Sequence, residues 1–305
     1  MEYLKLANGN LMVSRIALGC MRMGSMSVDE LETLILTSID EGINFFDHAD
    51  IYGGGKSEEL FGEVLKRNPN LRSKIIIQSK CGIRRGFYDS SKAHILESVD
   101  NILKRLGTDY LDILLIHRPD ALMEPIEIAE AFDILLKEKK VRYFGVSNMN
   151  AMQVSLLQKH LNNKLIFNQL QLSIVHAKMI DSGINVNMKN DASIDHDGSI
   201  LDYSRLNDIT IQPWSVLQAS WEEGSFLNNP KYASLNRKLN ELGEKYNVTP
   251  SAIAIAWILR HPAKMQPIVG TTSPKHLREL CQATKVSLTR KEWYELYLSV
   301  DRKLP

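Results

Sequence analysis

Short runs of apolar residues alternate with longer segments of helical periodicity along most of the chain. Apolar runs of about four to eight residues, rich in β-branched and aromatic side chains, predict strands buried on both faces. Between them, apolar residues recur every three to four positions, as in VDELETLILTSIDEG, where Ser27 is a suitable N-cap. The strands that we expect are residues 15–19, 44–47, 74–80, 110–117, 141–147, 165–172, 209–214 and 267–271.

Eight such strands separated by helices indicate a parallel sheet that is covered by helices on its outside. A closed barrel fits better than a doubly wound sheet, because no G-x-G-x-x-G motif opens a first helix. The length of 305 residues also suits a barrel of about 250 residues plus loops. We therefore predict an α/β protein with a single (β/α)8 TIM-barrel domain over residues 1–305. The long connections 173–208 and 217–233 follow the sixth and seventh strands, on the face where barrel active sites are built.

Composition narrows the class of protein. The content of 44% hydrophobic and 24% charged residues is typical of a soluble globular domain, and a net charge of +1 provides no field for nucleic acid. No apolar run approaches the roughly 18 residues that a membrane span requires, and the N-terminal segment lacks the pattern of a secretory signal. Three widely spaced cysteines suggest neither a disulfide framework nor a zinc site. These features predict a cytoplasmic protein with reduced thiols.

Ionisable side chains follow three consecutive strands of the predicted barrel. Asp47 ends the second strand, Lys80 the third and His117 the fourth, while Tyr52 lies just beyond Asp47. Because the carboxyl ends of barrel strands meet on one face, we expect these four side chains to share a pocket. A lysine ammonium can stabilise the phenolate of a tyrosine whose pKa is ordinarily near 10, a carboxylate can hold that lysine, and a histidine can orient a substrate oxygen. This set suits protonation of an alkoxide formed from a carbonyl.

A metal site is the main alternative use of the segment FFDHADIYGGG, since Asp47, His48 and His117 could serve a barrel hydrolase. Neighbouring residues on a strand point to opposite faces, so Asp47 and His48 are poorly placed to share one metal ion. We therefore expect no metal, with His48 outside the barrel and Asp50 at the loop or the pocket rim. The polar segment DASIDHDGS lacks the spacing of a metal loop and predicts a solvated turn.

The sequence resembles the aldo-keto reductase family over nearly its whole length. NFFDHADIYGGGKSEELFG is similar to the family's catalytic segment, IIIQSKCG to its lysine-bearing strand and YLDILLIHRPD to its histidine-bearing strand, and KKVRYFGVSN resembles a further family motif. The resemblance implies a catalytic tetrad of Asp47, Tyr52, Lys80 and His117, with Tyr52 as general acid. It also implies a monomer.

The same resemblance implies a nicotinamide cofactor. Ser147, Asn148 and Gln169 would bind the carboxamide, Trp214 would stack on the nicotinamide ring, and Ser215 and Leu217 would contact the pyrophosphate. Gly270 and His276 stand where relatives that prefer NADPH often carry basic residues. A helix starts in this region, and its N-terminus could receive a phosphate. NADPH is the cofactor that we expect, with NADH as the second choice. The residues implied at the adenine end are Gly270, Thr271, Thr272, Lys275 and Glu279.

The implied activity is reduction of aldehydes or ketones to alcohols, and the alternative is a cofactor-binding regulatory module with little turnover. The pocket walls are expected from residues 21–26, 84–90, 118–123 and 217–231, including Trp221 and Phe226. A short C-terminal tail predicts an open site for small or medium carbonyl compounds. Cys81 lies next to Lys80, and a cation lowers a thiol pKa. We nevertheless expect Cys81 to be a buried, inert thiol rather than a redox sensor.

Overall fold

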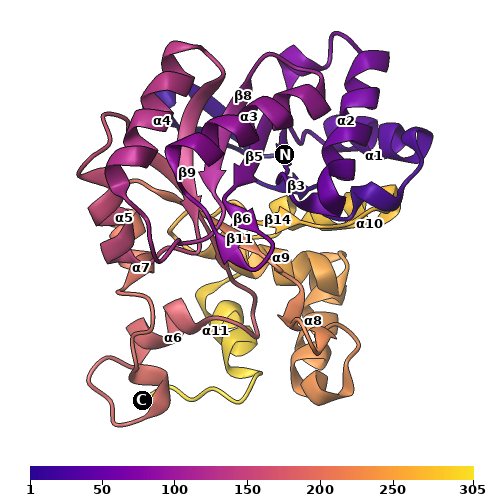
Figure 1. The fold of residues 1–305 in the computed structure, drawn as a ribbon. Helices are drawn as coiled ribbons and strands as arrows, with labels where there is room; N and C mark the ends of the chain where they lie inside the picture. The colour runs from indigo at the N-terminus through magenta and orange to yellow at the C-terminus, as the bar shows by residue number, and fades with distance from the viewer.

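Eight parallel strands form the centre of the computed structural model, which describes residues 1–305 (Figure 1). They are paired in the order β11-β10-β9-β8-β5-β4-β3-β14. The two outer strands meet through a hydrogen bond of 3.0 Å from the backbone N–H of Gln266 to the carbonyl of Ile211, so the sheet closes into the predicted barrel. The strands are β3 (Ala17–Gly19), β4 (Phe45–Asp47), β5 (Ile76–Cys81), β8 (Leu111–Ile116), β9 (Val141–Ser147), β10 (Leu165–Gln171), β11 (Thr210–Trp214) and β14 (Ile268–Val269).

Helices surround the barrel and begin where the sequence supplies caps. Ser27 is the N-cap of the first helix, as predicted, and forms a capping box with Glu30. Gly107 ends the third helix in the left-handed conformation. The helices are α1 (Val28–Asp40), α2 (Lys56–Arg67), α3 (Lys92–Leu106), α4 (Pro125–Lys137), α5 (Ala151–Gln158), α6 (Lys178–Ile184), α7 (Ile200–Leu206), α8 (Ala233–Tyr246), α9 (Pro250–Arg260), α10 (Pro274–Cys281) and α11 (Arg290–Leu298). None of them is long and apolar enough to cross a membrane.

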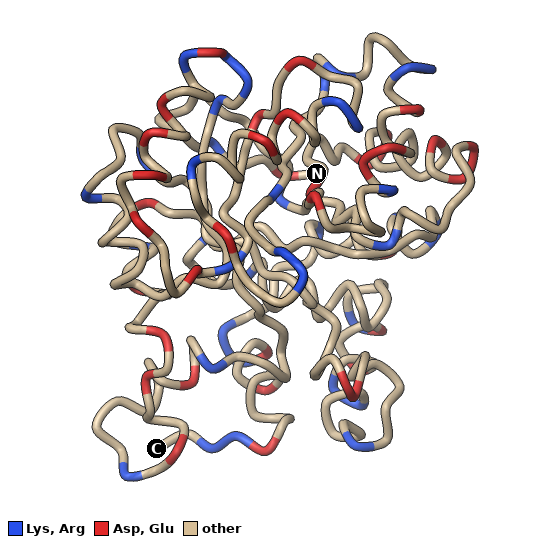
Figure 2. The backbone as a smooth tube through the Cα atoms, viewed as in Figure 1, with Lys and Arg blue, Asp and Glu red and all other residues tan.

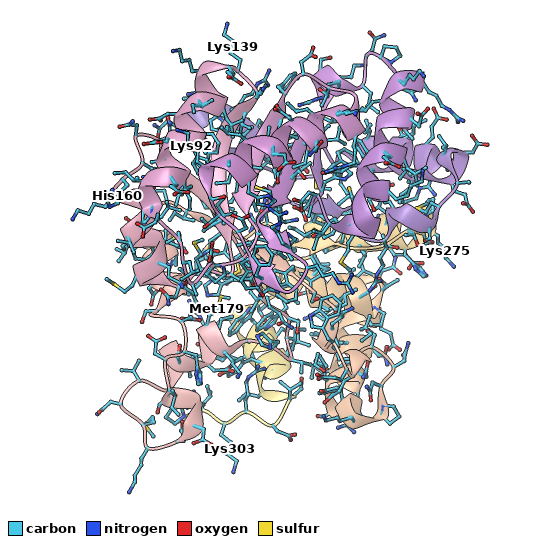
Figure 3. The ribbon with its side chains drawn as sticks, viewed as in Figure 1. Lys92, Lys139, His160, Met179, Lys275 and Lys303 are labelled. Atoms are coloured by element: carbon cyan, nitrogen blue, oxygen red, sulfur yellow. The ribbon has the colours of Figure 1, made fainter.

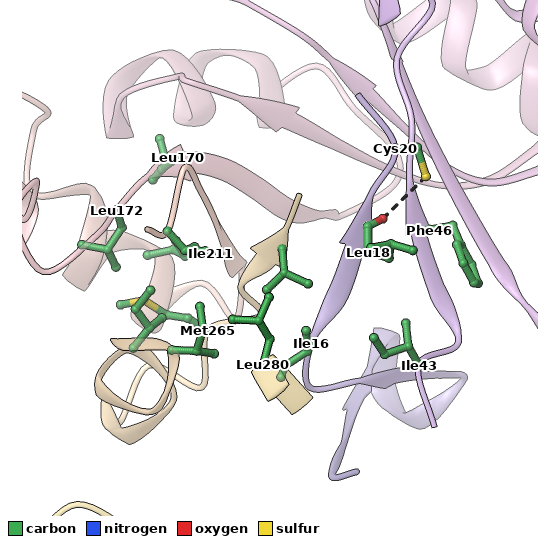
Figure 4. Packing of buried hydrophobic residues seen from close by; sticks show 14 of the residues in the cluster. Ile16, Leu18, Cys20, Ile43, Phe46, Leu170, Leu172, Ile211, Met265 and Leu280 are labelled. Atoms are coloured by element: carbon green, nitrogen blue, oxygen red, sulfur yellow. Dashed lines mark hydrogen bonds between the residues drawn. The ribbon is translucent and has the colours of Figure 1, made fainter. Parts of the chain in front are cut away.

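Two apolar cores hold the barrel together. The larger lies between the strands and the helices, and part of it, with Ile16, Leu18 and Phe46, is drawn in Figure 4. The smaller fills the barrel itself and includes Phe45 and Phe167, whose rings meet edge to face at 5.7 Å. Burial of these side chains provides the main stabilising free energy of the fold.

An N-terminal hairpin, which the sequence analysis did not predict, covers the bottom of the barrel. It consists of β1 (Tyr3–Leu6) and β2 (Leu11–Ser14), paired antiparallel. Leu4, Leu11 and Val13 join the interior core, so the hairpin excludes water from the end of the barrel opposite the active site.

The loops at the other end contain structure of their own. The connection 173–208 includes α6 and α7, and 217–233 includes the hairpin β12 (Gln218–Ser220) and β13 (Gly224–Ser225). A further hairpin, β6 (Ile83–Arg84) and β7 (Phe87–Tyr88), follows β5. Figure 2 shows acidic and basic residues interspersed along the backbone, in keeping with the small net charge.

Candidate active site

The ammonium group of Lys80 is the centre of the candidate site. Its Nζ donates to a carboxylate oxygen of Asp47 at 2.9 Å, to the carbonyl of His48 at 2.7 Å and to the hydroxyl of Tyr52 at 3.0 Å. Lys80 is fully buried, and Asp47 is nearly so. An ammonium has three protons to donate, and all three are used here. The arrangement therefore fixes the positions of Asp47 and Tyr52 relative to each other.

These contacts decide where the proton of Tyr52 points. Lys80 can only donate, so the phenol oxygen of Tyr52 must accept from it. The hydroxyl proton is then free to be donated elsewhere. The ring of His117 stands edge-on to that of Tyr52, with centroids 6.1 Å apart, and both residues line one cavity. A carbonyl oxygen placed between them could take the proton from Tyr52.

The electrostatic environment keeps each group in a defined protonation state. Burial raises the pKa of Tyr52, while the Lys80 charge opposes this, and the net pKa lies above the usual value. Lys80 therefore lowers the tyrosine pKa as expected, but burial has the larger effect and the phenol keeps its proton at neutral pH. Burial lowers the pKa of Lys80, but Asp47 and Tyr52 together raise it by more. The net pKa therefore lies above the usual value, and the ammonium remains charged. Burial, followed by the charges of Lys80 and Arg118, holds the pKa of His117 well below its ordinary value, which makes the ring neutral.

A turn of three glycines presents Tyr52 to the cavity. Gly53, Gly54 and Gly55 all have positive φ, from 60° to 93°, a conformation that glycine adopts without steric cost. Below the turn, the buried carboxylate of Glu58 on α2 accepts from Ser79 on β5 at 2.6 Å and from Arg105 on α3 at 2.8 Å. These bonds tie the start of α2 to the strand that carries Lys80.

Glutamine side chains inside the barrel form a network that the sequence analysis missed. Nε2 of Gln78 donates to Asp47 at 2.6 Å and to Gln212 at 2.9 Å, and Gln212 donates to Gln266 at 2.9 Å. Gln169 also donates to Asp47, at 3.1 Å. Amide donors thus hold the carboxylate that Lys80 neutralises. Polar residues at alternating positions within apolar strands were the available signal.

A cavity of about 870 Å³ opens at the carboxyl ends of the strands. The predicted residues that line it are Asp47, Tyr52, His117, Ser147, Asn148, Gln169, Trp214, Ser215, Leu217, Gly270, Thr271, His276 and Glu279. Lys80 lies behind Asp47 and Tyr52. Thr272 and Lys275 stand outside the lining and are exposed, and Figure 3 shows Lys275, in the first turn of α10, at the surface. Seven strand ends and α10 therefore converge on one space.

Polar contacts pre-arrange the residues expected to bind the nicotinamide. Nδ2 of Asn148 donates to Ser147 at 2.7 Å, and the indole N–H of Trp214 donates to Asn148 at 3.2 Å. Asn148 has a positive φ of 58°, which turns its side chain across the end of β9. The three side chains thus form one connected edge of the cavity.

The expected walls are only partly correct. Met21, Arg22, Arg118 and Trp221 line the cavity, but none of residues 84–90 does. Ile83 lines it instead, and residues 84–88 of the β6–β7 hairpin are exposed. Phe226 is fully buried in the outer core instead of facing the cavity. No residue beyond Leu280 lines the cavity.

His48 and Asp50 follow the end of β4, and neither lines the cavity, so Asp50 does not form the pocket rim. The ring of His48 packs edge-on against Phe61 of α2 at 4.6 Å, and burial, with the charge of Lys80, lowers its pKa to about 3. His48 therefore cannot join Asp47 at a metal ion, and the hydrolase hypothesis loses its ligand set. Cys81 is fully buried, and burial followed by nearby carboxylates raises its pKa well above the usual value, which supports an inert thiol.

Asp50 should make the stability of the protein depend on pH. Burial, then the charge of Glu58, raises its pKa to about 7 against the opposing charges of Arg105 and Lys80, and its Oδ1 has no hydrogen-bond partner. An unfolded aspartate has a pKa near 3.9, so the folded state holds a proton that the unfolded state releases between about pH 4 and 7. The wild type should lose stability as pH rises through this window.

Asp50→Asn removes this titration. We subtract the Tm of the wild type from the Tm of the variant. This difference should increase from pH 4 to pH 8, on the order of a few degrees. Asp40→Asn, at the exposed end of α1, is the matched control and should give a constant difference. Thermal unfolding followed by circular dichroism checks this, and a Tm difference for Asp50→Asn that is independent of pH would contradict it.

Known proteins are similar to this chain over most of its length. The family model described as "Aldo/keto reductase family" matches residues 15–297. The chain is 35% identical to a 6-dehydroglucose reductase of Agrobacterium fabrum, over 94% of each chain. It is also 35% identical to the oxidoreductase YdhF of Escherichia coli, over 93% of this chain and 92% of that one. A solved structure of the thermostable aldo-keto reductase Tm1743 with the inhibitor epalrestat aligns with a TM-score of 0.78 and 25% identity, covering 98% of this chain and all of that one.

Proposed function

The chain belongs to the aldo/keto reductase family and is an NAD(P)H-dependent carbonyl reductase, and from this premise we propose that Tyr52 is its proton donor. The observation that carries the proposal is the triple hydrogen bonding of Lys80, which leaves the phenol proton directed away from the lysine. His117 orients the carbonyl oxygen, and Asp47 keeps the ammonium in place. The family resemblance predicts the same four residues.

The residues that line the cavity fit a dinucleotide. The volume of about 870 Å³ lies near the upper end of ligand sites, and the lining runs from His117 at the end of β8 to Glu279 on α10. We propose that Ser147, Asn148 and Gln169 hold the carboxamide and that the half-buried indole of Trp214 supports the ring. Ser215 and Leu217 would contact the pyrophosphate. When bound, NAD(P)H supplies a hydride from nicotinamide C4 to the carbonyl carbon.

The protein's own contribution is positioning and proton delivery. The neutral ring of His117 has a buried Nδ1 without a partner and makes no hydrogen bond through Nε2, which is therefore available to bind the carbonyl oxygen. As negative charge develops on that oxygen, Tyr52 donates its proton. The phenolate that remains is stabilised by Lys80 at 3.0 Å, in surroundings from which water is largely excluded.

We propose NADPH as the preferred cofactor. The side chain of Arg22 lines the cavity and donates weakly to the carbonyl of Gly270 at 3.4 Å, and His276 lines it from α10. Ser273 caps α10 and Lys275 stands exposed in its first turn, where helix amides and a cation can receive a 2′-phosphate.

Lys275→Met should therefore weaken the binding of NADPH more than the binding of NADH. We expect KM for NADPH to rise on the order of fivefold, because one exposed charge-assisted contact is lost, with little change for NADH. Lys264→Met is the matched control, since Lys264 is also exposed and makes no side-chain contact. Steady-state kinetics with both cofactors checks this. An equal rise in KM for NADH would show that Lys275 does not bind the 2′-phosphate.

The proposed roles are tested by titrating the protein with NADPH and NADH and then assaying a panel of aldehydes and ketones for cofactor oxidation. Turnover of small carbonyl compounds is expected, with the lower KM for NADPH. Tight cofactor binding without turnover of any carbonyl would instead favour the regulatory module, which neither the family nor the relatives support. Two relatives are named 6-dehydroglucose reductase, so we include polyhydroxylated aldehydes in the panel. We further propose a cytoplasmic location, which the three buried free cysteines support, and a monomer, which the family resemblance implies.

A further inference from the structure

The residue after His117 places an unpaired cation in the active-site cavity. Arg118 is half-buried and lines the same space as Tyr52 and His117. Its guanidinium carbon lies 5.9 Å from the ring centre of Trp214. The side chain donates no hydrogen bond to any group of the protein, and no carboxylate lies within salt-bridge distance of it.

This state of Arg118 is unusual within the molecule. Four other arginines are half-buried, and each has a carboxylate partner. The pairs are Arg15 with Glu2, Arg72 with Asp112, Arg105 with Glu58, and Arg302 with Asp181. A guanidinium that is withdrawn from water ordinarily needs such a partner, because its desolvation is otherwise uncompensated. Arg118 alone among the half-buried arginines lacks one.

No acid near Arg118 or in the cavity forms an ion pair with it. Asp120 uses one carboxylate oxygen on the backbone and hydroxyl of Ser90 and the other on the N–H of Leu122. Within the cavity, Asp47 is neutralised by Lys80, and the remaining acid is Glu279, on α10. The protein therefore contains no counter-ion for Arg118, and a ligand in the cavity could supply one.

The walls beside Arg118 indicate the rest of such a ligand. Trp214 and Trp221 lie 6.3 Å apart with ring planes inclined by 38°, and Trp221 extends from the β12–β13 hairpin at the cavity mouth. Trp221, which is not among the residues proposed to hold the cofactor, thus adds flat apolar surface on this side of the cavity. The carbonyl oxygen of a substrate would occupy the end of the cavity at Tyr52 and His117, which leaves Arg118 for a second substituent.

We propose that the physiological substrate is an aldehyde or ketone that carries an anionic oxyacid group, a carboxylate or a phosphate, bound by the guanidinium of Arg118. The planar fork of an arginine matches such a group with two parallel hydrogen bonds. This inference rests on the proposed function, since it concerns the substrate of the same site. It makes Arg118 a determinant of specificity, separate from the proton-donating machinery.

Matched substrates test the inference. 4-Carboxybenzaldehyde and methyl 4-formylbenzoate share the 4-formylbenzoyl group and differ in charge, and glyceraldehyde 3-phosphate and glyceraldehyde make the corresponding pair for phosphate. In the wild type, kcat/KM should favour at least one anionic member by about 10- to 100-fold through a lower KM, the range expected for a charge-assisted hydrogen bond. In Arg118→Met the ratio should fall to near one, and Arg118→Lys should restore part of it.

Arg85→Met is the matched control, since Arg85 is exposed on the β6–β7 turn and lies outside the cavity lining. An unchanged ratio in Arg118→Met, or an equal change in Arg85→Met, would overturn the inference, as would a wild type that prefers neither anion. Quenching of tryptophan fluorescence by terephthalate provides a readout that does not need turnover. If no carbonyl compound is reduced, the proposed function fails. If terephthalate binds Arg118→Met with the same affinity as the wild type, this inference alone is overturned.

Discussion

Tyr52→Phe is expected to lower kcat by about 10²- to 10⁴-fold, the usual contribution of a positioned general acid. The substitution removes the hydroxyl and keeps the ring, so the packing against His117 is retained. It also removes the acceptor at 3.0 Å from Lys80, whose bonds to Asp47 and His48 remain. Cofactor affinity should therefore change little, since Tyr52 is not among the residues proposed to hold the cofactor.

Steady-state kinetics and a fluorescence titration with NADPH measure the two effects separately. Tyr88→Phe is the matched control, because Tyr88 is exposed on β7 and lies outside the cavity lining. A Tyr52→Phe enzyme with wild-type kcat would show that another group donates the proton. Loss of cofactor binding together with kcat would assign Tyr52 a structural role instead.

Lys80→Met should impair both folding and catalysis. It leaves the nearly buried carboxylate of Asp47 without its cation, and breaking a buried ion pair in this way costs about 3–5 kcal/mol of the free energy of unfolding. Turnover should fall on the order of that of Tyr52→Phe, because the phenolate formed during proton transfer loses its stabilising charge.

The double variant Asp47→Asn with Lys80→Met separates the loss of stability from the loss of turnover. Removing both charges should recover most of the free energy of unfolding, since no uncompensated charge remains, while turnover stays low. Urea unfolding and kcat measure the two quantities. Recovered activity in the double variant would contradict the role of the ammonium, and a single variant as stable as the wild type would contradict the coupling between Asp47 and Lys80.

Much of the barrel could be predicted from the sequence, because its strands are near-continuous apolar runs and its helices begin at caps such as Ser27. The four tetrad residues could be selected once the strands were predicted, because the carboxyl ends of the strands of a parallel barrel converge on one face. Their contacts agree with that selection. The roles assigned to them remain proposals that the two substitutions above address.

Other features depend on contacts between distant segments and could not be predicted. Gln78 and Gln212 lie on β5 and β11, and Gln266 lies just before β14. Their alternating polar positions are visible in the sequence, but their contacts under Asp47 form only when the barrel closes. The N-terminal hairpin, by contrast, carries an available signal that the sequence analysis did not use, an Asn8-Gly9 turn between two short, mostly apolar segments. The pKa of Tyr52 depends on the balance between burial and the Lys80 charge, and the unpaired state of Arg118 depends on which acids lie near it in space.

Transfer of deuterium tests the central claim most directly. The protein is incubated with an aldehyde and with NADPH deuterated at C4 on each face in turn, and the alcohol is examined by mass spectrometry and NMR. Reduction by the proposed site predicts deuterium on the carbinol carbon from one face only, with Tyr52→Phe slowing this transfer by about 10²- to 10⁴-fold. Alcohol formed without deuterium from either face, or no alcohol from any aldehyde, would contradict carbonyl reduction at the Asp47–Tyr52–Lys80–His117 site.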